Sequence, residues 1–206
     1  MNKLIIYIFV FITLIVFNSC IIVKENVEND VAPAITLSPK PIIPMSETLV
    51  RSKIGDMIAF LPKDWFFVDL EDKISKNVFA IAVNPDYTLS AIFSEIPPNA
   101  RINELLKKEG LIGLARSAIA NRIEKTAGGI KLQGKYTTIN MGTSSFCKYA
   151  FSPKNSSLIS NSVVFISIIN KYYEFALVPM NIKGKPIPDK KEIEKIFYSI
   201  MATIQY

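Results

Sequence analysis

The pattern of apolar and polar residues divides the chain into three parts. Residues 4–17 form a nearly unbroken apolar run of fourteen residues that follows the positive charge of Lys3. As a helix this run would reach only about 21 Å, which is short of the roughly 30 Å hydrocarbon core of a bilayer. The pattern therefore predicts a signal peptide over residues 1–19 rather than a permanent membrane span.

The second part, residues 20–47, has no apolar period and is interrupted by proline. The prolines are Pro33, Pro39, Pro41 and Pro44. Proline cannot sustain a helix interior or a central strand, so we predict a flexible tether over this range. Its expected reach lies between about 30 Å as a coil and about 80 Å when extended.

The third part, residues 48–206, alternates between strand and helix patterns and is predicted to be one globular domain. Short apolar or alternating runs bounded by turn residues indicate β-strands. We place these strands at residues 57–61, 65–70, 78–83, 87–96, 130–139, 145–152, 163–169 and 172–178. Apolar positions at helical spacing over 102–123, interrupted by Gly110 and Gly113, predict one long helix or two short ones.

The C-terminal segment carries the clearest helix signal. Asp189 is placed to cap it, and Glu192 completes a capping-box pattern. One apolar stripe follows, made of Ile193, Ile196, Phe197, Ile200, Met201 and Ile204. A stripe this regular most often faces the protein's own core. The elements together predict an α+β fold in which an antiparallel β-sheet is flanked by helices, an α/β/α sandwich.

Cys20 directly follows the apolar run, and Phe17-Asn18-Ser19-Cys20 resembles the lipobox of bacterial lipoprotein precursors. In that class the cysteine sulfur takes a diacylglyceryl group before cleavage. Two or three acyl chains would make release from a bilayer negligible, since each buried methylene contributes about 0.8 kcal/mol. The resemblance implies a bacterial envelope protein anchored to the lipid bilayer through acylated Cys20. An Asp after the cysteine would resemble the signal that keeps many lipoproteins on the inner membrane, so by this resemblance Ile21 favours the outer membrane.

The chain has two cysteines, so acylation of Cys20 would leave Cys147 without an intrachain partner. Cys147 shares its predicted strand face with Tyr149 and Phe151, which indicates a small buried hydrophobe rather than a reactive thiol. Trp65 is expected to be a core anchor of the sheet.

Charge is uneven along the chain, whose net charge is +6: residues 48–206 carry 21 basic and 14 acidic side chains. A basic domain above a membrane can be attracted to anionic head groups or bind an acidic partner. No basic stripe is interleaved with aromatic residues, so nucleic-acid binding is not expected.

The chain contains no histidine, which removes Ser-His-Asp and Cys-His catalysis and the commonest ligand of catalytic zinc. Residues 145–148 spell S-x-x-K, but positions three apart on a strand point to opposite sides. The acidic group of Asp69, Glu71 and Asp72 indicates a solvated turn rather than a cation site. We therefore predict a protein that is not an enzyme, with no catalytic residues, metal or cofactor.

Pro62-Lys63-Asp64-Trp65 after the first predicted strand, together with the closing amphipathic helix, resembles the PsbP-like family over about Ser46 to Gln205. Its members include extrinsic proteins of photosystem II and many bacterial lipoproteins. The resemblance implies a sheet between helices and a non-enzymatic accessory or binding role. No functional residues carry over, because the members bind different partners through different surfaces.

Two functions remain open from the sequence. The first is a tethered binding or assembly module that holds an unknown protein partner near the membrane by a sheet face or a loop. The second is a carrier of a small apolar ligand between sheet and helix, which a large lined cavity would favour.

Replacing the anchoring sulfur tests the lipid anchor. We expect Cys20→Ala to leave a soluble precursor or an unlipidated exported form, because no acyl chain can then be attached. Detergent phase partitioning of wild type and variant measures this, and equal partitioning of the two would contradict the anchor.

Overall fold

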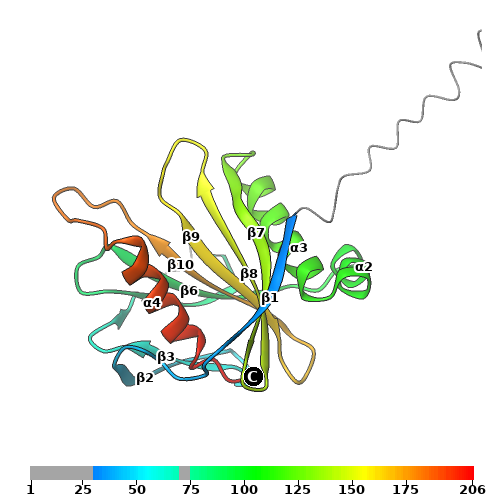
Figure 1. The fold of residues 1–206 in the computed structure, drawn as a ribbon, viewed down its shortest axis with the longest axis horizontal. Coiled ribbons are helices and arrows are strands. Elements are labelled where there is room, and N and C mark those ends of the chain that lie inside the picture. The colour runs from blue at the N-terminus through cyan, green and yellow to red at the C-terminus, as the bar shows by residue number, and fades with distance from the viewer. Residues whose placement is uncertain (1–29, 70–74) are drawn as a thin grey trace, which may run out of the picture.

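The computed structural model describes residues 30–69 and 75–206 (Figure 1). The signal peptide predicted for residues 1–19 and the lipidation site predicted at Cys20 lie outside this range. Each helix within the range is too short or too polar to cross a bilayer.

Eight of the described strands form one sheet, in the spatial order β1-β7-β8-β9-β10-β6-β5-β4. Their bounds are β1 Val31–Leu37, β4 Phe66–Phe67, β5 Val78–Val83, β6 Leu89–Ile96, β7 Ile130–Met141, β8 Ser144–Pro153, β9 Ser160–Ile166 and β10 Tyr172–Pro179. A second sheet pairs β2 (Met45–Arg51) with β3 (Ile58–Pro62). Neighbouring strands of the large sheet are antiparallel except β1, which runs parallel to β7.

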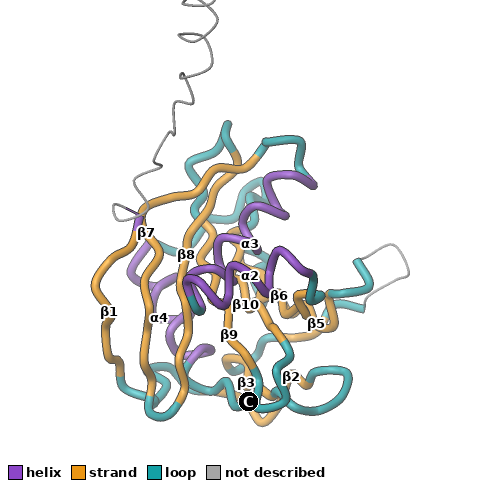
Figure 2. Tube along the Cα trace, turned by 90° about the vertical axis from the view of Figure 1, so that its right-hand side faces the viewer, coloured by secondary structure: helices purple, strands orange, loops and turns teal. Residues whose placement is uncertain are grey.

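Helices cover both faces of the large sheet (Figures 1 and 2). On one face lies α4 (Lys190–Met201), and on the other lie α2 (Ala100–Glu109) and α3 (Leu111–Lys125). The predicted α+β fold, a sheet flanked by helices, is confirmed, although β1 makes the sheet mixed rather than purely antiparallel.

Stacked aromatic rings fill the interface between α4 and the sheet. The ring centroids of Phe93 and Phe175 are 4.9 Å apart, and those of Phe175 and Phe197 are 5.3 Å apart. All three side chains are fully buried. The predicted apolar stripe of α4 faces this core, and Asp189 accepts a hydrogen bond from the Glu192 amide at 2.9 Å, which confirms the predicted cap.

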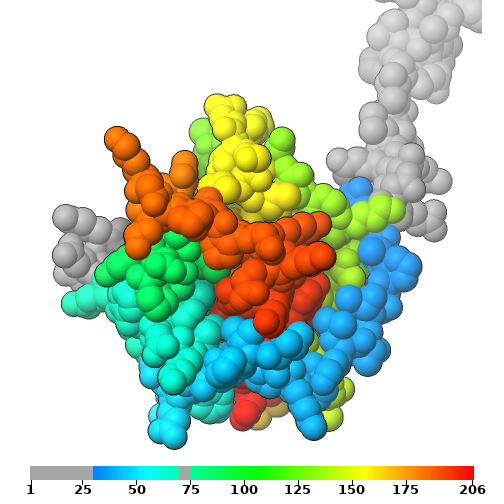
Figure 3. Space-filling model, turned by 60° about the vertical axis from the view of Figure 1, so that its left-hand side comes forward, coloured from blue at the N-terminus to red at the C-terminus, as the bar shows by residue number. Residues whose placement is uncertain are grey.

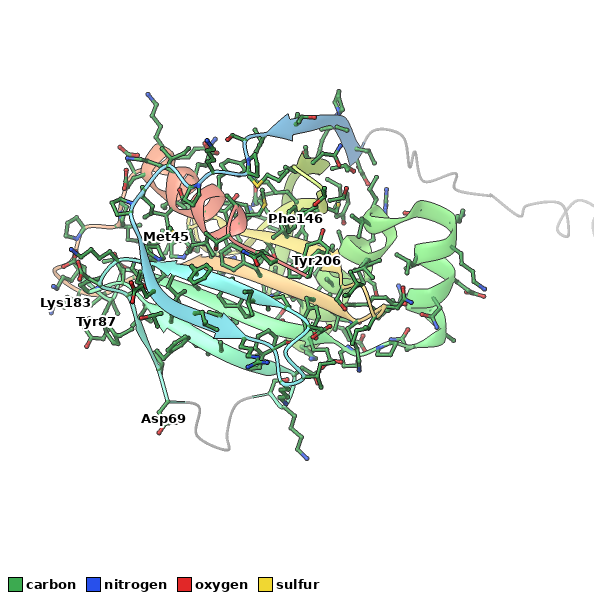
Figure 4. The ribbon with its side chains drawn as sticks, turned by 90° about the horizontal axis from the view of Figure 1, so that it is seen from below. Met45, Asp69, Tyr87, Phe146, Lys183 and Tyr206 are labelled. Carbon is green, nitrogen blue, oxygen red and sulfur yellow. The ribbon has the colours of Figure 1, made fainter. Side chains whose placement is uncertain are left out.

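Tyr206 is fixed against the same core. Its hydroxyl accepts a hydrogen bond from the Ser145 amide (2.8 Å) and donates one to the Ser145 carbonyl (2.7 Å). Its ring contacts Phe146 edge-on, with ring centroids 5.7 Å apart. Figure 4 shows the two labelled residues near each other, seen from below. Tyr206 therefore closes the end of the β7–β8 hairpin.

The second core lies between the sheet and α3. Two glycines, Gly110 and Gly113, explain why two helices rather than one cover this face. Gly110 ends α2 with a φ of +60°, a conformation that side chains disfavour. At Gly113 a Cβ atom would lie 2.2 Å from the Leu105 carbonyl oxygen, so only glycine allows the two helices to approach this closely. The apolar period over 102–123 is thus broken into α2 and α3.

The tether predicted for residues 20–47 is wrong over its second half, because Val31–Leu37 forms β1 and Met45–Arg51 forms β2. Pro33 is tolerated because β1 is an edge strand, and its pairing shifts register between Ala32 and Ile35. The segment between the two strands passes α4, where the Ile42 amide donates a hydrogen bond to the buried Ser199 hydroxyl at 3.0 Å.

The strand predicted at 65–70 is also shorter than expected, since β4 contains only Phe66 and Phe67. It begins after Asp64, whose φ of +68° marks a tight turn, and it lies at the edge of the sheet. Trp65 itself is buried in the α4-side core, as predicted.

Removing the ring of Phe197, which α4 contributes to the aromatic stack, should destabilise the domain. We expect Phe197→Ala to lower the free energy of unfolding by about 3–5 kcal/mol, because truncation leaves a cavity under α4. Ile182→Ala, at a partly exposed loop position, should change it by less than about 0.5 kcal/mol. Urea denaturation measures both, and a loss below about 1 kcal/mol for Phe197→Ala would contradict this packing.

Candidate partner-binding groove

A groove runs between α4 and the outer strands of the sheet; we call it the α4 groove. It consists of two adjoining cavities of about 360 and 200 Å³. Residues shared by both cavities are Ile159, Asn161, Lys190 and Glu194. Figure 3 views this side of the molecule, with α4 in orange and red below the yellow loop that joins β8 to β9.

An irregularity in β7 shapes the floor of the groove. Gln133 pairs with Ala150 and Thr137 pairs with Lys148, so three residues of β7 lie opposite the single residue Tyr149. The first of the three, Gly134, has a φ of +72°. A bulge of this kind bends its strand and redirects side chains, and here Gly134 and Lys135 line the groove.

The Lys148 side chain is held against two aromatic residues of α4. Its Nζ donates a hydrogen bond to the Tyr198 hydroxyl at 2.9 Å. The same nitrogen lies 4.9 Å from the ring centroid of Tyr198 and 5.6 Å from that of Phe197. Cation–π attraction and the hydrogen bond together fix the half-buried ammonium group at the groove wall.

The described lining of the groove is basic and carries apolar side chains at its margins. Lys135, Lys148 and Lys190 face a single carboxylate, Glu194. Ile159 and Ile35 also line the groove, with 42% and 37% of their side chains exposed. Such a surface can bind an extended segment that carries carboxylates and one or two aliphatic side chains.

The opposite face of the sheet holds a buried carboxylate that is bonded to three other elements. Glu174 on β10 is only 6% exposed. Its Oε1 accepts hydrogen bonds from the Ser162 hydroxyl (2.6 Å) and the Tyr149 hydroxyl, and Arg122 Nη2 lies 2.9 Å away. The Arg122 guanidinium also lies 4.8 Å from the ring centroid of Phe151.

Electrostatics stabilise this cluster. Burial raises the pKa of the Tyr149 hydroxyl, so it remains a neutral donor. Burial alone would lower the pKa of Arg122, but the Glu174 carboxylate raises it beyond its ordinary value. A cleft of about 210 Å³ lies beside the pair. Because Arg122 and Glu174 bond to each other and to core residues, we interpret the cluster as a structural link that holds α3 on the sheet.

The residues singled out from the sequence lie apart from one another. Cys147 is completely buried in the α3-side core together with Tyr149 and Phe151, as predicted. Ser145 and Lys148 do not meet, since the Ser145 hydroxyl donates to Asn140 Oδ1 at 2.9 Å while Lys148 contacts Tyr198. The S-x-x-K pattern therefore forms no nucleophilic site.

The predicted acidic turn is described only in part, because Glu71 and Asp72 lie outside the described residues while Asp69 is exposed. Within the described range, no group of three or more potential ligands is placed to hold a metal ion.

Sequence reasoning missed both the α4 groove and the buried cluster. Lys148 and Tyr198 are 50 positions apart, and no local pattern joins them. For the buried cluster a signal was present: Glu174 is a lone charge within the otherwise apolar strand Tyr172–Pro179. A single carboxylate in such a strand predicts a buried partner.

Comparison with solved structures identifies the fold. Cyanobacterial PsbP (CyanoP) from Synechocystis sp. PCC 6803 aligns with a TM-score of 0.54 and 14% identity, covering 77% of this chain and 92% of that one. The domain therefore has a PsbP-like fold, as its sequence resemblance implied.

Two further structures align with lower scores. A protein from Bacteroides thetaiotaomicron VPI-5482 has a TM-score of 0.35 and 17% identity, covering 76% of this chain and 47% of that one. LpqN, involved in cell envelope biogenesis of Mycobacterium tuberculosis, has a TM-score of 0.38 and 14% identity, covering 79% and 92%. No family model and no curated protein matches the sequence.

The burial of Cys147 has a direct chemical consequence. Burial raises the pKa of its thiol to about 12, so at pH 8 almost none of it is the reactive thiolate. In a Cys20→Ala background we expect an aromatic disulfide reagent to leave Cys147 unmodified in native buffer and to modify it rapidly in urea. An added Ile182→Cys supplies an exposed reference thiol, and native modification of Cys147 at the reference rate would contradict its burial.

Proposed function

We propose that this chain is a lipid-anchored accessory protein of the bacterial cell envelope, without enzymatic activity, whose domain binds an acidic segment of a protein partner in the α4 groove. The observation that carries the proposal is the fixed ammonium group of Lys148 between Tyr198 and Phe197. A charge already held in place loses little conformational freedom when a carboxylate binds it.

Charge complementarity supports the acidic character of the partner segment. The groove's three lysines outnumber its one glutamate among the described lining residues, and residues 48–206 as a whole carry seven more basic than acidic side chains. An anionic segment would be steered toward this face and held at short range by charge-assisted hydrogen bonds. A cationic segment would meet repulsion at the same place.

The alternative of an apolar carrier is less well supported. The space between α4 and the sheet is occupied by the stacked rings of Phe93, Phe175 and Phe197. The 210 Å³ cleft on the α3 side has the charged pair Arg122 and Glu174 at its lining. A small apolar ligand would have to displace packed rings or desolvate these charges, and both are costly.

Anchoring at Cys20 would bring the groove close to the membrane surface. Asp30 lies ten positions after Cys20 in the sequence. Even fully extended they span at most about 35 Å. A partner held in the groove would therefore stay near the bilayer, and the residue after Cys20 favours the outer membrane.

Site-specific photocrosslinking in cells tests the groove. A photoreactive phenylalanine analogue at Ile159, inside the groove, should give one prominent adduct, whereas the same analogue at exposed Tyr87 should not. Lys148→Glu should reduce the Ile159 adduct about tenfold or more, because it replaces attraction by repulsion, and Lys148→Arg should retain it. Equal adducts from both positions, or an adduct unaffected by Lys148→Glu, would contradict the proposal.

A further inference from the structure

The turn between β9 and β10 presents two isoleucines to solvent. Ile168 is 83% exposed and Ile169 is 52% exposed. Around them the Ser167 amide donates to the Lys171 carbonyl at 2.8 Å, and the Asn170 amide donates to the Ser167 carbonyl at 2.9 Å. The turn is thus a closed, hydrogen-bonded one, and its isoleucines project from its tip.

Folding does not require these isoleucines. The turn depends on Asn170, whose φ of +60° suits asparagine far better than a branched side chain. The central positions of such a turn normally carry polar residues or proline, and a branched apolar residue there gains no packing. Two consecutive exposed isoleucines at a tip therefore indicate a surface that becomes covered.

A third isoleucine extends this surface from a neighbouring turn. Ile54, in the turn between β2 and β3, is 60% exposed. Asp56 joins this turn to the start of β10, directly after the β9–β10 turn, because its Oδ1 accepts hydrogen bonds from the Ser52 hydroxyl (2.7 Å) and the Tyr173 hydroxyl (2.6 Å). Burial opposes its ionisation, but hydrogen bonds from Ser167, Tyr173 and Ser52 lower the pKa of Asp56. We call Ile54, Ile168 and Ile169 the isoleucine tip.

Exposed basic side chains flank the isoleucine tip, whereas the carboxylates of Asp56 and Glu95 form hydrogen bonds or ion pairs within the domain. Lys53, Lys76 and Arg51 are exposed, and Lys53 Nζ donates to the Lys76 carbonyl at 2.6 Å. Among the described residues, Asp56 is bonded as above and Glu95 pairs with Lys171 at 3.1 Å, while the exposed Asp69 lines a cavity together with Arg51. Among the described residues, the exposed charges next to Ile54 are therefore those of Lys53 and Lys76, and both are positive.

We propose that the isoleucine tip inserts into the head-group region of an anionic bilayer. Aliphatic side chains that project from narrow turns and are bordered by lysine and arginine fit the boundary between acyl chains and head groups. Each nearby basic residue adds attraction to an anionic leaflet. A protein partner is the less favoured occupant, because two projecting turns offer less contact surface than a groove or a flat face.

The inference rests on the proposed function only in that the chain is held at a bilayer. The ten chain steps from Cys20 to Asp30 span up to about 35 Å, similar to the length of a ten-residue strand such as β8. The anchor and the tip can therefore reach the same leaflet, and together they would fix the orientation of the domain.

Tryptophan quenching in vesicles tests the tip. The full chain carrying Ile168→Trp, purified from membranes, is reconstituted into vesicles of phosphatidylethanolamine and phosphatidylglycerol at about three to one, with or without brominated acyl chains. Trp65 is buried and serves as an internal reference, and Ile182→Trp is the matched control at a partly exposed loop position. We expect bromine to quench the emission of the tryptophan introduced at position 168 about twofold, and to leave the Ile182→Trp protein like wild type.

Flotation of the same samples separates the failure of this inference from that of the anchor. If the protein floats with the vesicles but the Ile168→Trp variant is quenched no more than the Ile182→Trp variant, insertion of the isoleucine tip is contradicted. The lipid anchor is supported in that case. Protein that stays at the bottom of the gradient overturns both. An in-cell crosslink from position 168 to a protein, without quenching in vesicles, identifies a protein-docking turn and also overturns the proposal.

Discussion

The central strands of the sheet are buried on both faces, and the rest of the structure follows from this constraint. Its central strands β8, β9, β10 and β6 must carry apolar side chains toward α4 and toward α3 at once. A charge in such a strand is tolerated only when it is fully bonded. Glu174 meets that condition through Arg122, Tyr149 and Ser162, and in doing so it joins α3 to three adjacent strands.

The same constraint confines the proposed partner binding to the margins of the domain. Because helices cover most of both faces, the surfaces left for a partner are the edge strands, the turns and the strip of sheet that the twelve-residue α4 does not cover. The bulge in β7 and the strand β1 turn that strip into the α4 groove, and Lys148 gives it a fixed positive charge. The PsbP-like fold determines where such a site can lie, but not what it binds.

The sequence predicted the elements whose signals are local. Val78–Val83 is predictable because a continuous apolar run bounded by Asn84-Pro85 has few other interpretations. The cap at Asp189 is predictable because the cap and its apolar stripe lie within sixteen residues. β1 was missed because Pro33 excludes a central strand but not an edge strand, and which strand lies at an edge depends on long-range pairing. The groove was missed for the same reason, since Lys148, Ile159 and Tyr198 meet only after β8 has packed beside α4. The anchor at Cys20 stays a prediction from sequence.

We propose that the partner segment binds in the α4 groove and leaves the two packed cores unchanged. NMR titration of the isotope-labelled full chain in nanodiscs with a glutamate-rich peptide tests it most directly. The account predicts that amide shifts concentrate at Lys148, Ile159 and Tyr198 and disappear in high salt, because the attraction is electrostatic. Shifts centred instead on Arg122 and the α3-side cleft, or spread through both cores, would contradict it.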